Sequence, residues 1–427
     1  MSSNSSIHVK ARSIDDFMKP HHLISEEARR FCAALRRFVD EEVLPHEHEL
    51  DDYWDWTERK EETFVHNLWK RLLIDLGLQK SFVPPELGGT GGFSNVDMVA
   101  MIEEVARGDY GLATTAFISP WSIAALAIPT PNESLLKEVA SHLLSDEVCL
   151  ICSALTEPHA GGSLEDLRLK GAFIRTKARL EGNEWVVNGH KLWPSAFREA
   201  KMYRVLCAIE GAQFPNNLAQ IFVPAHAKGV STSRPYRKMG ASIDTNGDIW
   251  FENVRVPKEM KAHEDPEEEL KSIKANVAIG RLFTSAFVLG VMKRAYEVLR
   301  KYVENRETAG RPMGDHEAIA YDLGKIAQDI MTAESYLYDA AARMDRPELY
   351  GPPWERKMLV VASACQNTVG ELGWKVVTRG LEIMGSFGYS REGRMEKLAR
   401  DIKIGHIVVG GPTLRLMEVA RYYFGSE

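Results

Sequence analysis

The stretch EIMGSFGYSREGRMEKLARDIKIGHIVVGGPT, residues 382–413, shows how the C-terminal half of this chain is built. It opens with a glycine-punctuated turn, continues as a basic helical segment around Arg400, and closes with a second glycine-rich turn before Thr413. Glycine is the residue that most readily adopts the left-handed backbone conformations of tight turns. The pattern therefore predicts a helix between two turns, within a larger set of C-terminal helices.

The surrounding region, from about Lys274 to Tyr423, has apolar residues at helical spacing over long segments with short breaks. Such segments are typical of a helical bundle. Three of them precede the stretch above: ANVAIGRLFTSAFVLGVMKRAYEVLRKYVENR, HEAIAYDLGKIAQDIMTAESYLYDAAARM and ERKMLVVASACQNTVGELGWKVVTRGLEIMG. The acidic run EDPEEELK, which begins at Glu264, is predicted to be a solvated linker or the start of a helix.

The middle of the chain has a different periodicity. Between about Val148 and Pro257, short segments rich in β-branched and aromatic residues are separated by Gly, Pro and Asn turns. This spacing is typical of strands in a small barrel or sandwich. The predicted strands are VCLICSAL, AFIRTKARLEG, EWVVNGHKLW, MYRVLCAIE, LAQIFVPA and DIWFENVRVP.

The region before these strands is predicted to be helical, because apolar residues recur at helical spacing from Ile24 to about Leu76, again from Asn95 to Arg107, and in ESLLKEVASHLLS. The predicted fold class is therefore α+β. An N-terminal tail (1–22) precedes an N-terminal α-helical domain (23–147), a central small β-barrel or sandwich domain (148–262) and a C-terminal α-helical bundle (263–427). A β module between two helical blocks leaves a crevice where all three meet, and ligands commonly bind in such crevices.

Composition excludes several classes of function. The chain has 427 residues and a net charge of -7, so it lacks the basic character expected of a protein that binds nucleic acid. No apolar run reaches the roughly 20 residues needed to cross a bilayer. The polar N-terminus contains Asp15 and Asp16 and lacks the apolar core of a secretory signal. We therefore expect a cytoplasmic protein without a membrane span.

The five cysteines are scattered along the chain and do not suggest a disulfide framework. Cys149 and Cys152 form a C-x-x-C pair, but they lie in the apolar run VCLICSAL and no second pair completes a zinc site. We interpret them as buried thiols and expect no metal site.

Several motifs together resemble the acyl-CoA dehydrogenase family of flavoproteins, and the resemblance covers nearly the whole chain. The motifs are Leu155-Thr156-Glu157-Pro158 with Ala160-Gly161, Asn188-Gly189-His190-Lys191-Leu192-Trp193-Pro194-Ser195, Phe251-Glu252-Asn253-Val254-Arg255-Val256-Pro257, Gly290, Arg306 with Gly310, and Arg400-Asp401. In this family a flavin takes a hydride from the β-carbon of an acyl-CoA thioester while a protein carboxylate removes the α-proton. The resemblance implies an oxidoreductase that uses FAD, acts on an acyl-CoA, passes electrons to an electron-transfer flavoprotein or another acceptor, and forms a homodimer or homotetramer.

The resemblance also implies which residues bind the flavin. Thr156 and Ser195 match hydroxyls that hydrogen-bond the isoalloxazine ring, and Trp193 matches the indole packed against it. Arg306 matches the arginine that pairs with the FAD pyrophosphate, a role suited to a guanidinium. The full implied set is Leu155, Thr156, Trp193, Ser195, Arg306, Glu317, Glu382 and Gly385. The simpler alternatives are a core aromatic for Trp193, a turn residue for Ser195 and a solvated bundle arginine for Arg306.

For the substrate, the resemblance implies two residues. Ser163 or Gly162 falls where a serine that contacts the substrate is usual, and Arg281 matches an arginine near the acyl pocket. For Arg281 a structural ion pair is an equally good interpretation.

Four departures from the family pattern bear on function. The catalytic glutamate of most members falls on Val409, and the alternative base position of other members, one residue before Arg281, falls on Gly280. A usual phenylalanine is Ala309. Two glutamines that usually help to bind the dinucleotide are Glu317 and Glu382, and a carboxylate near a diphosphate is unfavourable unless it is protonated, paired or turned toward the ribose.

A dehydrogenase without either usual carboxylate must place a base near the α-carbon from elsewhere. Asp109 is one candidate, because some members that act on cyclic substrates draw a base from this N-terminal region. Its alternative role is a helix cap or an ion pair with Arg107. His406 is a second candidate on the right turn, but we expect its side chain to face away.

Three functional hypotheses follow. The first is FAD-dependent α,β-dehydrogenation of an unusual acyl-CoA, cyclic, branched or aromatic-derived, with a relocated base. The second is a desulfinase or decarboxylase, in which a leaving group departs and no α-proton need be removed. The third is a binding subunit of a heteromer with little turnover.

Overall fold

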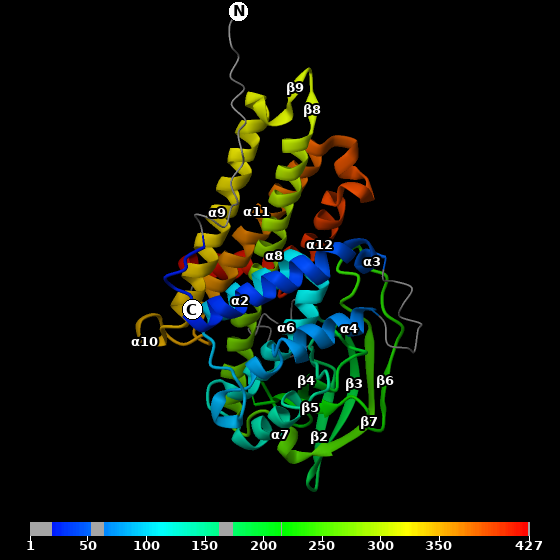
Figure 1. Cartoon of the computed structure of the whole chain (residues 1–427). Coiled ribbons are helices and arrows are strands. Elements are labelled where there is room, and N and C mark those ends of the chain that lie inside the picture. The colour runs from blue at the N-terminus through cyan, green and yellow to red at the C-terminus, as the bar shows by residue number, and fades with distance from the viewer. Residues whose placement is uncertain (1–18, 53–63, 162–173, 215, 426–427) are drawn as a thin grey trace, which may run out of the picture.

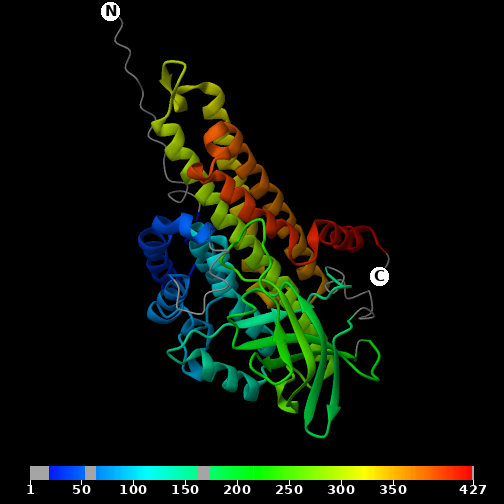
Figure 2. The same cartoon turned by 90° about the vertical axis from the view of Figure 1, so that its right-hand side faces the viewer.

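The computed structural model describes residues 19–52, 64–161, 174–214 and 216–425. Helices come first, a β-sheet follows, and a second block of helices ends the chain. The sheet lies at one end of a long helical bundle, and the N-terminal helices pack beside the middle of the molecule (Figure 1, Figure 2). The predicted α+β class, with helical domains before and after a small β domain, is confirmed.

Side-chain caps define the starts of the N-terminal helices. The Ser94 hydroxyl and the Asp97 carboxylate form a reciprocal capping box at the start of α5, which satisfies backbone N–H groups that have no partner within the helix. The helix α5 then packs along the bundle helix α8, and nearly all its residues are buried. The helices described in this region are α2 (Glu26–Phe38), α3 (Glu47–Asp51), α4 (Phe64–Lys70), α5 (Asn95–Gly108), α6 (Tyr110–Ala127) and α7 (Glu133–Leu143).

The central domain is a seven-stranded mixed sheet of order β1-β4-β2-β3-β7-β6, with β5 paired to β4. The strand β4 is buried along almost its whole length, and it runs parallel to both β1 and β2. Sequence analysis missed β6, because a three-residue strand has no recognisable period. The strands are β1 (Ile151–Ala154), β2 (Lys177–Glu181), β3 (Glu184–Leu192), β4 (Met202–Ile209), β5 (Leu218–Pro224), β6 (Val230–Thr232) and β7 (Asp248–Pro257).

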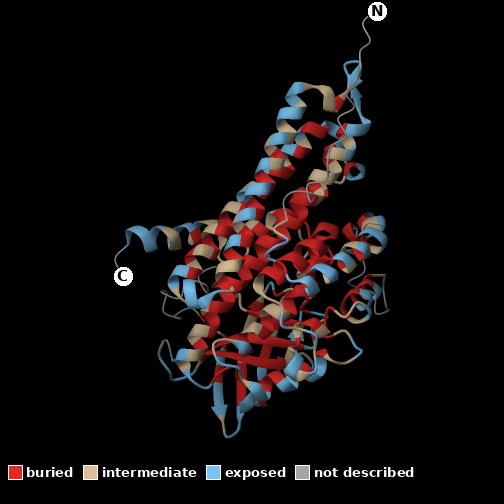
Figure 3. Cartoon of the chain, turned by 60° about the vertical axis from the view of Figure 1, so that its left-hand side comes forward, coloured by how far each residue is buried: buried red, intermediate tan, exposed pale blue. Residues whose placement is uncertain are grey.

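The C-terminal bundle is organised around α8, a 40-residue helix capped by Asp265. The acidic run EDPEEELK is thus the start of this helix, where negative charge is favourable. Within the described ranges, α8 is the one helix with the length and apolar composition to span a membrane, and that apolar window is wholly buried among other helices (Figure 3). The elements of the bundle are α8 (Pro266–Asn305), the hairpin β8 (Glu307–Thr308) and β9 (Arg311–Pro312), α9 (Glu317–Met344), α10 (Pro347–Tyr350), α11 (Arg356–Tyr389), α12 (Met395–Ile407) and α13 (Gly411–Phe424).

The stretch 382–413 forms the predicted helix between turns, with one difference. The glycine-punctuated turn predicted near Gly385 is a kink, because α11 continues to Tyr389 on both sides of this one non-helical residue. The basic segment is α12, and the second glycine-rich turn joins it to α13. The helix α13 packs against α11 along one face, and its end projects from the molecule (Figure 2) and exposes Tyr423 and Phe424.

All five cysteines are free and buried, and these include Cys149 and Cys152, which were expected to be buried thiols. Burial raises the pKa of Cys149 to about 11 and that of Cys152 well above its ordinary value. A thiol in such surroundings is a poor nucleophile and a poor metal ligand, because both roles need the thiolate. The C-x-x-C pair is therefore part of the core.

Candidate functional site

Trp193 follows the end of β3 and presents half of its surface, 50%, to solvent. Its backbone has a φ of +66°, which is uncommon for a residue other than glycine. The indole packs on Tyr236, with 4.4 Å between ring centroids, and the Tyr236 hydroxyl donates a 2.8 Å hydrogen bond to Asp248. An aromatic plane that is held on one side and open on the other is suited to stack on a flat ring.

Leu155 and Thr156 lie beside Trp193, as the resemblance implied. The backbone N–H of Leu192 donates to the Thr156 carbonyl at 2.8 Å, and the Lys191 Nζ donates to the Leu155 carbonyl at 2.9 Å. These bonds join the end of β1 to the end of β3. Within the described ranges the Thr156 hydroxyl makes no hydrogen bond, so it is available to a ligand.

Ser195 is held differently from Thr156. Its hydroxyl donates to the Asp244 carboxylate at 2.9 Å, and the Ala196 N–H donates to the same carboxylate at 3.2 Å. Burial raises the pKa of Asp244, while Lys238 opposes that shift. Sequence analysis missed Asp244, because SIDTNGD looks like an ordinary polar turn. Its carboxylate fixes the position of Ser195.

The other implied cofactor residues lie far from this cluster. Arg306 ends α8 at the β8–β9 hairpin, and Figure 1 shows this hairpin at the opposite end of the bundle from the sheet. Glu317 is exposed at the start of α9. Phe387 of α11 stacks on Tyr302 of α8 with ring centroids 5.5 Å apart, which places the Gly385 kink at this same distal end.

The charge of Glu382 is compensated at this distal end. Its carboxylate forms an ion pair with Arg379, which also pairs with Asp322 at the surface of α9. A paired carboxylate is one of the cases in which an acidic residue is tolerated near a diphosphate. Gly385 adopts φ +60° and ψ -137°, a backbone conformation for which glycine is suited.

The residues thus fit FAD as two half-sites. One has a half-exposed indole and a hydroxyl without a hydrogen-bond partner in the described part of the chain, both suited to a ring system, and the other has an exposed arginine, Arg306, for a diphosphate. A single chain does not bring the two half-sites together.

The turn between α12 and α13 carries Val409, at the usual position of the base, and has an unusual backbone conformation there. Val409, Gly410 and Gly411 have φ values of +57°, +99° and +68°. A β-branched residue with positive φ is a conformational outlier. Arg415 holds the turn by donating to the Val408 carbonyl at 2.7 Å and to the Val409 carbonyl at 3.4 Å. The turn is fixed, but the Val409 side chain cannot accept a proton.

The second base position is closed by Trp121 of α6. A Cβ atom at Gly280 would lie 2.7 Å from the Trp121 ring, closer than real Cβ contacts allow. The indole is held in place because its Nε1 donates to the Asn276 carbonyl at 2.7 Å and the Asn276 Nδ2 donates back to the Trp121 carbonyl at 2.6 Å. No glutamate fits at position 280 while Trp121 stands there.

Arg281 lies between these two positions and is fully buried. Its Nη1 forms a 2.6 Å ion pair with Glu418 of α13 and donates to the Ser363 hydroxyl of α11 at 2.7 Å. The structural ion pair that was one interpretation of Arg281 is therefore present. Sequence analysis missed Glu418, because a lone glutamate in the last helix carries no motif.

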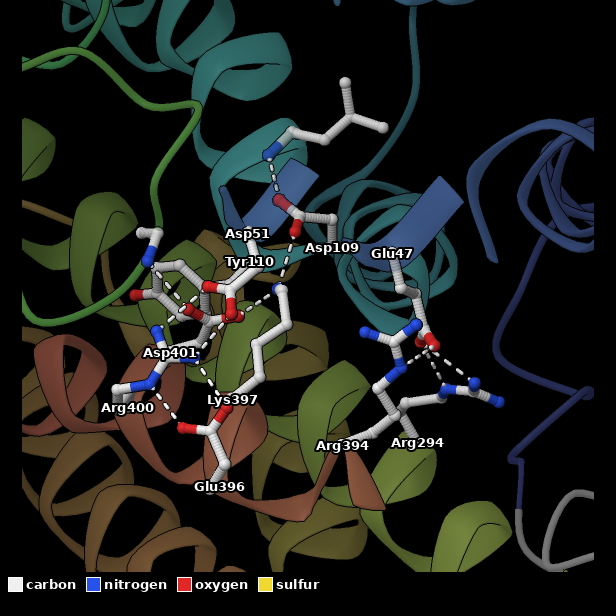
Figure 4. A network of polar contacts seen from close by, with 12 residues as sticks. Glu47, Asp51, Asp109, Tyr110, Arg294, Arg394, Glu396, Lys397, Arg400 and Asp401 are labelled. Atoms are coloured by element: carbon white, nitrogen blue, oxygen red, sulfur yellow. Dashed lines mark hydrogen bonds and ion pairs between the residues drawn. The ribbon is translucent and has the colours of Figure 1, made fainter. Parts of the chain in front are cut away.

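Asp109 is engaged in structural contacts. It caps α6 by accepting the Leu112 N–H at 2.8 Å, and it pairs with Lys397 of α12 at 2.7 Å (Figure 4). Burial opposes the charge of Lys397, but Asp109 and Asp401 outweigh it and raise its pKa. The helix cap was one predicted alternative. The predicted partner Arg107 pairs instead with Asp40 and Glu297.

Two further residues were named from the sequence, His406 as a possible base and Ser163 as a substrate contact. The His406 ring packs against Gly370 of α11, and burial lowers its pKa. Ser163 lies outside the described residues.

Comparisons with known proteins agree with this arrangement. Models of the N-terminal, middle and C-terminal domains of acyl-CoA dehydrogenases match residues 25–141, 152–254 and 270–423. The chain is 24% identical over 420 residues to a short/branched chain specific acyl-CoA dehydrogenase of Bos taurus, covering 98% of this chain and 91% of that protein. It is 26% identical over 397 residues to a cyclohexane-1-carbonyl-CoA dehydrogenase of Syntrophus aciditrophicus, covering 93% and 96%.

The fold has solved counterparts. Butyryl-CoA dehydrogenase from Megasphaera elsdenii matches it with a TM-score of 0.81 at 22% identity, covering 94% of this chain and 98% of that chain. The three domain models follow one another along the chain in the order of its helical, sheet and helical parts. The chain therefore belongs to the acyl-CoA dehydrogenase family of FAD-dependent oxidoreductases.

Proposed function

We propose that this protein is an FAD-dependent dehydrogenase that introduces an α,β double bond into a cyclic, branched or aromatic-derived acyl-CoA, with its base relocated from position 409. The observation that carries the proposal is the half-exposed indole of Trp193, which contacts Tyr236 and adjoins Thr156, whose hydroxyl makes no hydrogen bond among the described residues. A planar cofactor is the ligand that best fits such a face. When bound, FAD supplies the acceptor for the hydride that leaves the β-carbon.

Leu155, Thr156, Trp193 and Ser195 would hold the ring system of the cofactor. Arg306, Glu317, Glu382 and Gly385 would hold its dinucleotide part from a second copy of the chain, because one chain separates the two groups. This arrangement supports a homodimer as the minimal active unit, or a homotetramer of two such dimers. Electrons would leave to an electron-transfer flavoprotein or another acceptor.

A complementation experiment tests the shared cofactor site. Trp193→Ala and Arg306→Ala each damage one half-site, so each variant alone should retain less FAD than the wild type after gel filtration. A mixed dimer of the two variants contains one site with both residues intact. Coexpression should therefore restore part of the bound FAD, whereas two independent sites within single chains would give no restoration.

Two features support an unusual acyl group. Trp121 stands where some members of the family carry their base, so the space beside Gly280 has a different shape. Two similar proteins are named for short or branched and for cyclohexane-derived acyl groups. A cyclohexane-1-carbonyl group or an α-branched acyl group carries two carbon substituents on its α-carbon, so it is wider there than a linear acyl group.

The direct test is reduction of the bound flavin by acyl-CoA thioesters. The purified protein, loaded with FAD, is mixed with cyclohexane-1-carbonyl-CoA, 2-methylbutyryl-CoA, benzoyl-derived and linear acyl-CoAs, and the flavin absorbance is followed. We expect bleaching with at least one branched or cyclic thioester and an unsaturated product by mass spectrometry. A flavin that stays oxidised throughout would refute the proposal.

Val409 itself favours one alternative, a reaction that removes no α-proton. A desulfinase or decarboxylase on an acyl-CoA would need no base at this position. Product analysis separates the two, because the alternative releases sulfite or carbon dioxide along with the thioester product.

A further inference from the structure

We propose that Glu418 is the relocated base, the carboxylate that accepts the α-proton of the acyl-CoA. This inference rests on the proposed function and names a residue for it. Among the described residues, Glu418 is the carboxylate that pairs with Arg281. Arg281 in turn lies next to both usual base positions, Gly280 and Val409.

Arg281 connects the three positions. It directly follows Gly280 in α8, and its Nε donates to the Val409 carbonyl at 3.4 Å. Its Nη1 lies 2.6 Å from the Glu418 carboxylate. The carboxylate of Glu418 therefore lies against the same guanidinium that touches the two places from which members of the family supply a base.

The side chain of Glu418 points inward from a helix that is otherwise largely exposed. Its exposed fraction is 11%, whereas the preceding residues Leu416 and Met417 are 52% and 43% exposed. The helix α13 begins at Gly411, directly after the turn that carries Val409. The chain thus places a carboxylate two turns further along, on the face that packs against α8 and α11.

The two oxygens of this carboxylate have different surroundings. Oε2 accepts from Arg281 at 2.6 Å and lies 2.8 Å from the Ser363 hydroxyl, whose single hydrogen also faces the Leu359 carbonyl at 2.6 Å. Within the described part of the chain, Oε1 accepts no hydrogen bond. The charged Arg281 donor fixes Oε2, and Oε1 keeps its lone pairs to accept a proton, as a general base must.

The proposed step is a simple proton transfer. The C–H bond at the α-carbon breaks, and an O–H bond forms at Oε1 of Glu418. The electron pair left on the α-carbon forms the double bond as hydride leaves the β-carbon for the flavin. Because the Glu418 side chain is 11% exposed, the proton can then pass to solvent.

The simpler role for Glu418 is to compensate the buried charge of Arg281, and the test must separate the two roles. Glu418→Gln keeps the shape and removes the base. Glu418→Gln with Arg281→Met removes both charges together, so no buried charge is left unpaired. Glu418→Gln with Val409→Glu returns a carboxylate to the usual position of the family.

The readouts are single-turnover flavin reduction by cyclohexane-1-carbonyl-CoA and 2-methylbutyryl-CoA, bound FAD and thermal unfolding. We expect Glu418→Gln to slow reduction by about 10²–10⁴-fold, the usual contribution of a general base, with FAD retained. The variant that also lacks Arg281 should stay slow, and the variant with Val409→Glu should recover at least tenfold. Glu297→Gln, which breaks the 2.6 Å pair with the nearly buried Arg107, is the control and should reduce at the wild-type rate.

Several outcomes would overturn the inference. If the wild type is reduced and Glu418→Gln is reduced within threefold of its rate, Glu418 is not the base. If removal of both charges restores the rate, Glu418 only compensates Arg281. If the wild type is reduced by neither these nor the other thioesters, the proposed function fails first, and the assignment of Glu418 fails with it.

Discussion

The indole of Trp121 occupies the space into which any side chain at position 280 would extend. A Cβ atom at position 280 would lie 2.7 Å from the Trp121 ring. Asn276 holds Trp121 by two hydrogen bonds, one from the indole Nε1 to its own carbonyl and one from its Nδ2 to the Trp121 carbonyl. Glycine at 280 is therefore a packing requirement of this molecule. Because Trp121 fills this space, position 280 cannot carry a base.

Gly280→Ala should destabilise the protein by about 1–3 kcal/mol, the usual cost of forcing an extra methyl group into a packed core. Alanine favours a helix over glycine by about 1 kcal/mol, so a smaller net loss would show that Trp121 can move aside. Urea unfolding of both proteins measures the difference. Gly324→Ala is the matched control, because Gly324 lies in α9 with no atom within 4 Å of its Cβ position. It should be neutral or stabilising.

Trp193→Ala should weaken FAD binding by about 0.5–1.5 kcal/mol, a factor of about 2–13 in Kd, because it removes one aromatic contact with the ring. Titration of the apoprotein with FAD, followed by quenching of flavin fluorescence, measures Kd. Tyr236→Phe keeps the stacked ring but removes the 2.8 Å bond to Asp248, so its effect should be smaller. If the wild type and both variants bind FAD with equal affinity, Trp193 is not part of the cofactor site.

Glu269 makes stability depend on pH in a defined window. Burial raises its pKa from 4.5 to about 7, against the opposing effects of Lys261 and of hydrogen bonds from Gln220 and His263. At pH values between 4.5 and about 7, the Glu269 carboxyl is ionised in the unfolded chain but still protonated in the folded chain. The contribution of Glu269 to the free energy of unfolding therefore falls as pH rises from 4.5 to about 7, and levels off above that.

Glu269→Gln should remove this contribution, which is on the order of 3 kcal/mol for a shift of this size. The measurement is urea unfolding at pH 5 and pH 8, and the loss of stability between the two should be smaller in the variant. Glu133→Gln, at an exposed helix start, should leave the pH dependence unchanged. Parallel curves for Glu269→Gln and the wild type would contradict the assignment.

Local motifs allowed the sequence to predict the fold and to group the residues of one half of the proposed cofactor site. Leu155, Thr156, Trp193 and Ser195 stand at the ends of two strands, and strand ends that pair must lie together. The helix cap at Asp109 was open to prediction for the same reason, since a cap involves the next few residues. Its partner Lys397 was not, because the two residues are separated by 288 positions.

Contacts between distant helices account for what the sequence could not show. Helical periodicity indicates that a face is buried, but it does not identify the helix that covers it. Trp121 against Gly280 and Glu418 against Arg281 are contacts of this kind, and each changes the interpretation of a base position. The distance between Arg306 and Trp193 depends on the length of the bundle, which no motif encodes.

Val409 in the turn should carry a measurable cost. Its φ of +57° is unfavourable for a β-branched residue, by about 1–3 kcal/mol, whereas asparagine tolerates this region. Val409→Asn should therefore raise the free energy of unfolding by about 1 kcal/mol in urea, because the main-chain bonds to Arg281 and Arg415 do not involve the side chain. Val408→Asn, at an ordinary φ of -68°, should give no gain. A gain at 409 alone would show that the two arginines impose this backbone on valine, whereas equal losses at both positions would show that valine packing holds the turn.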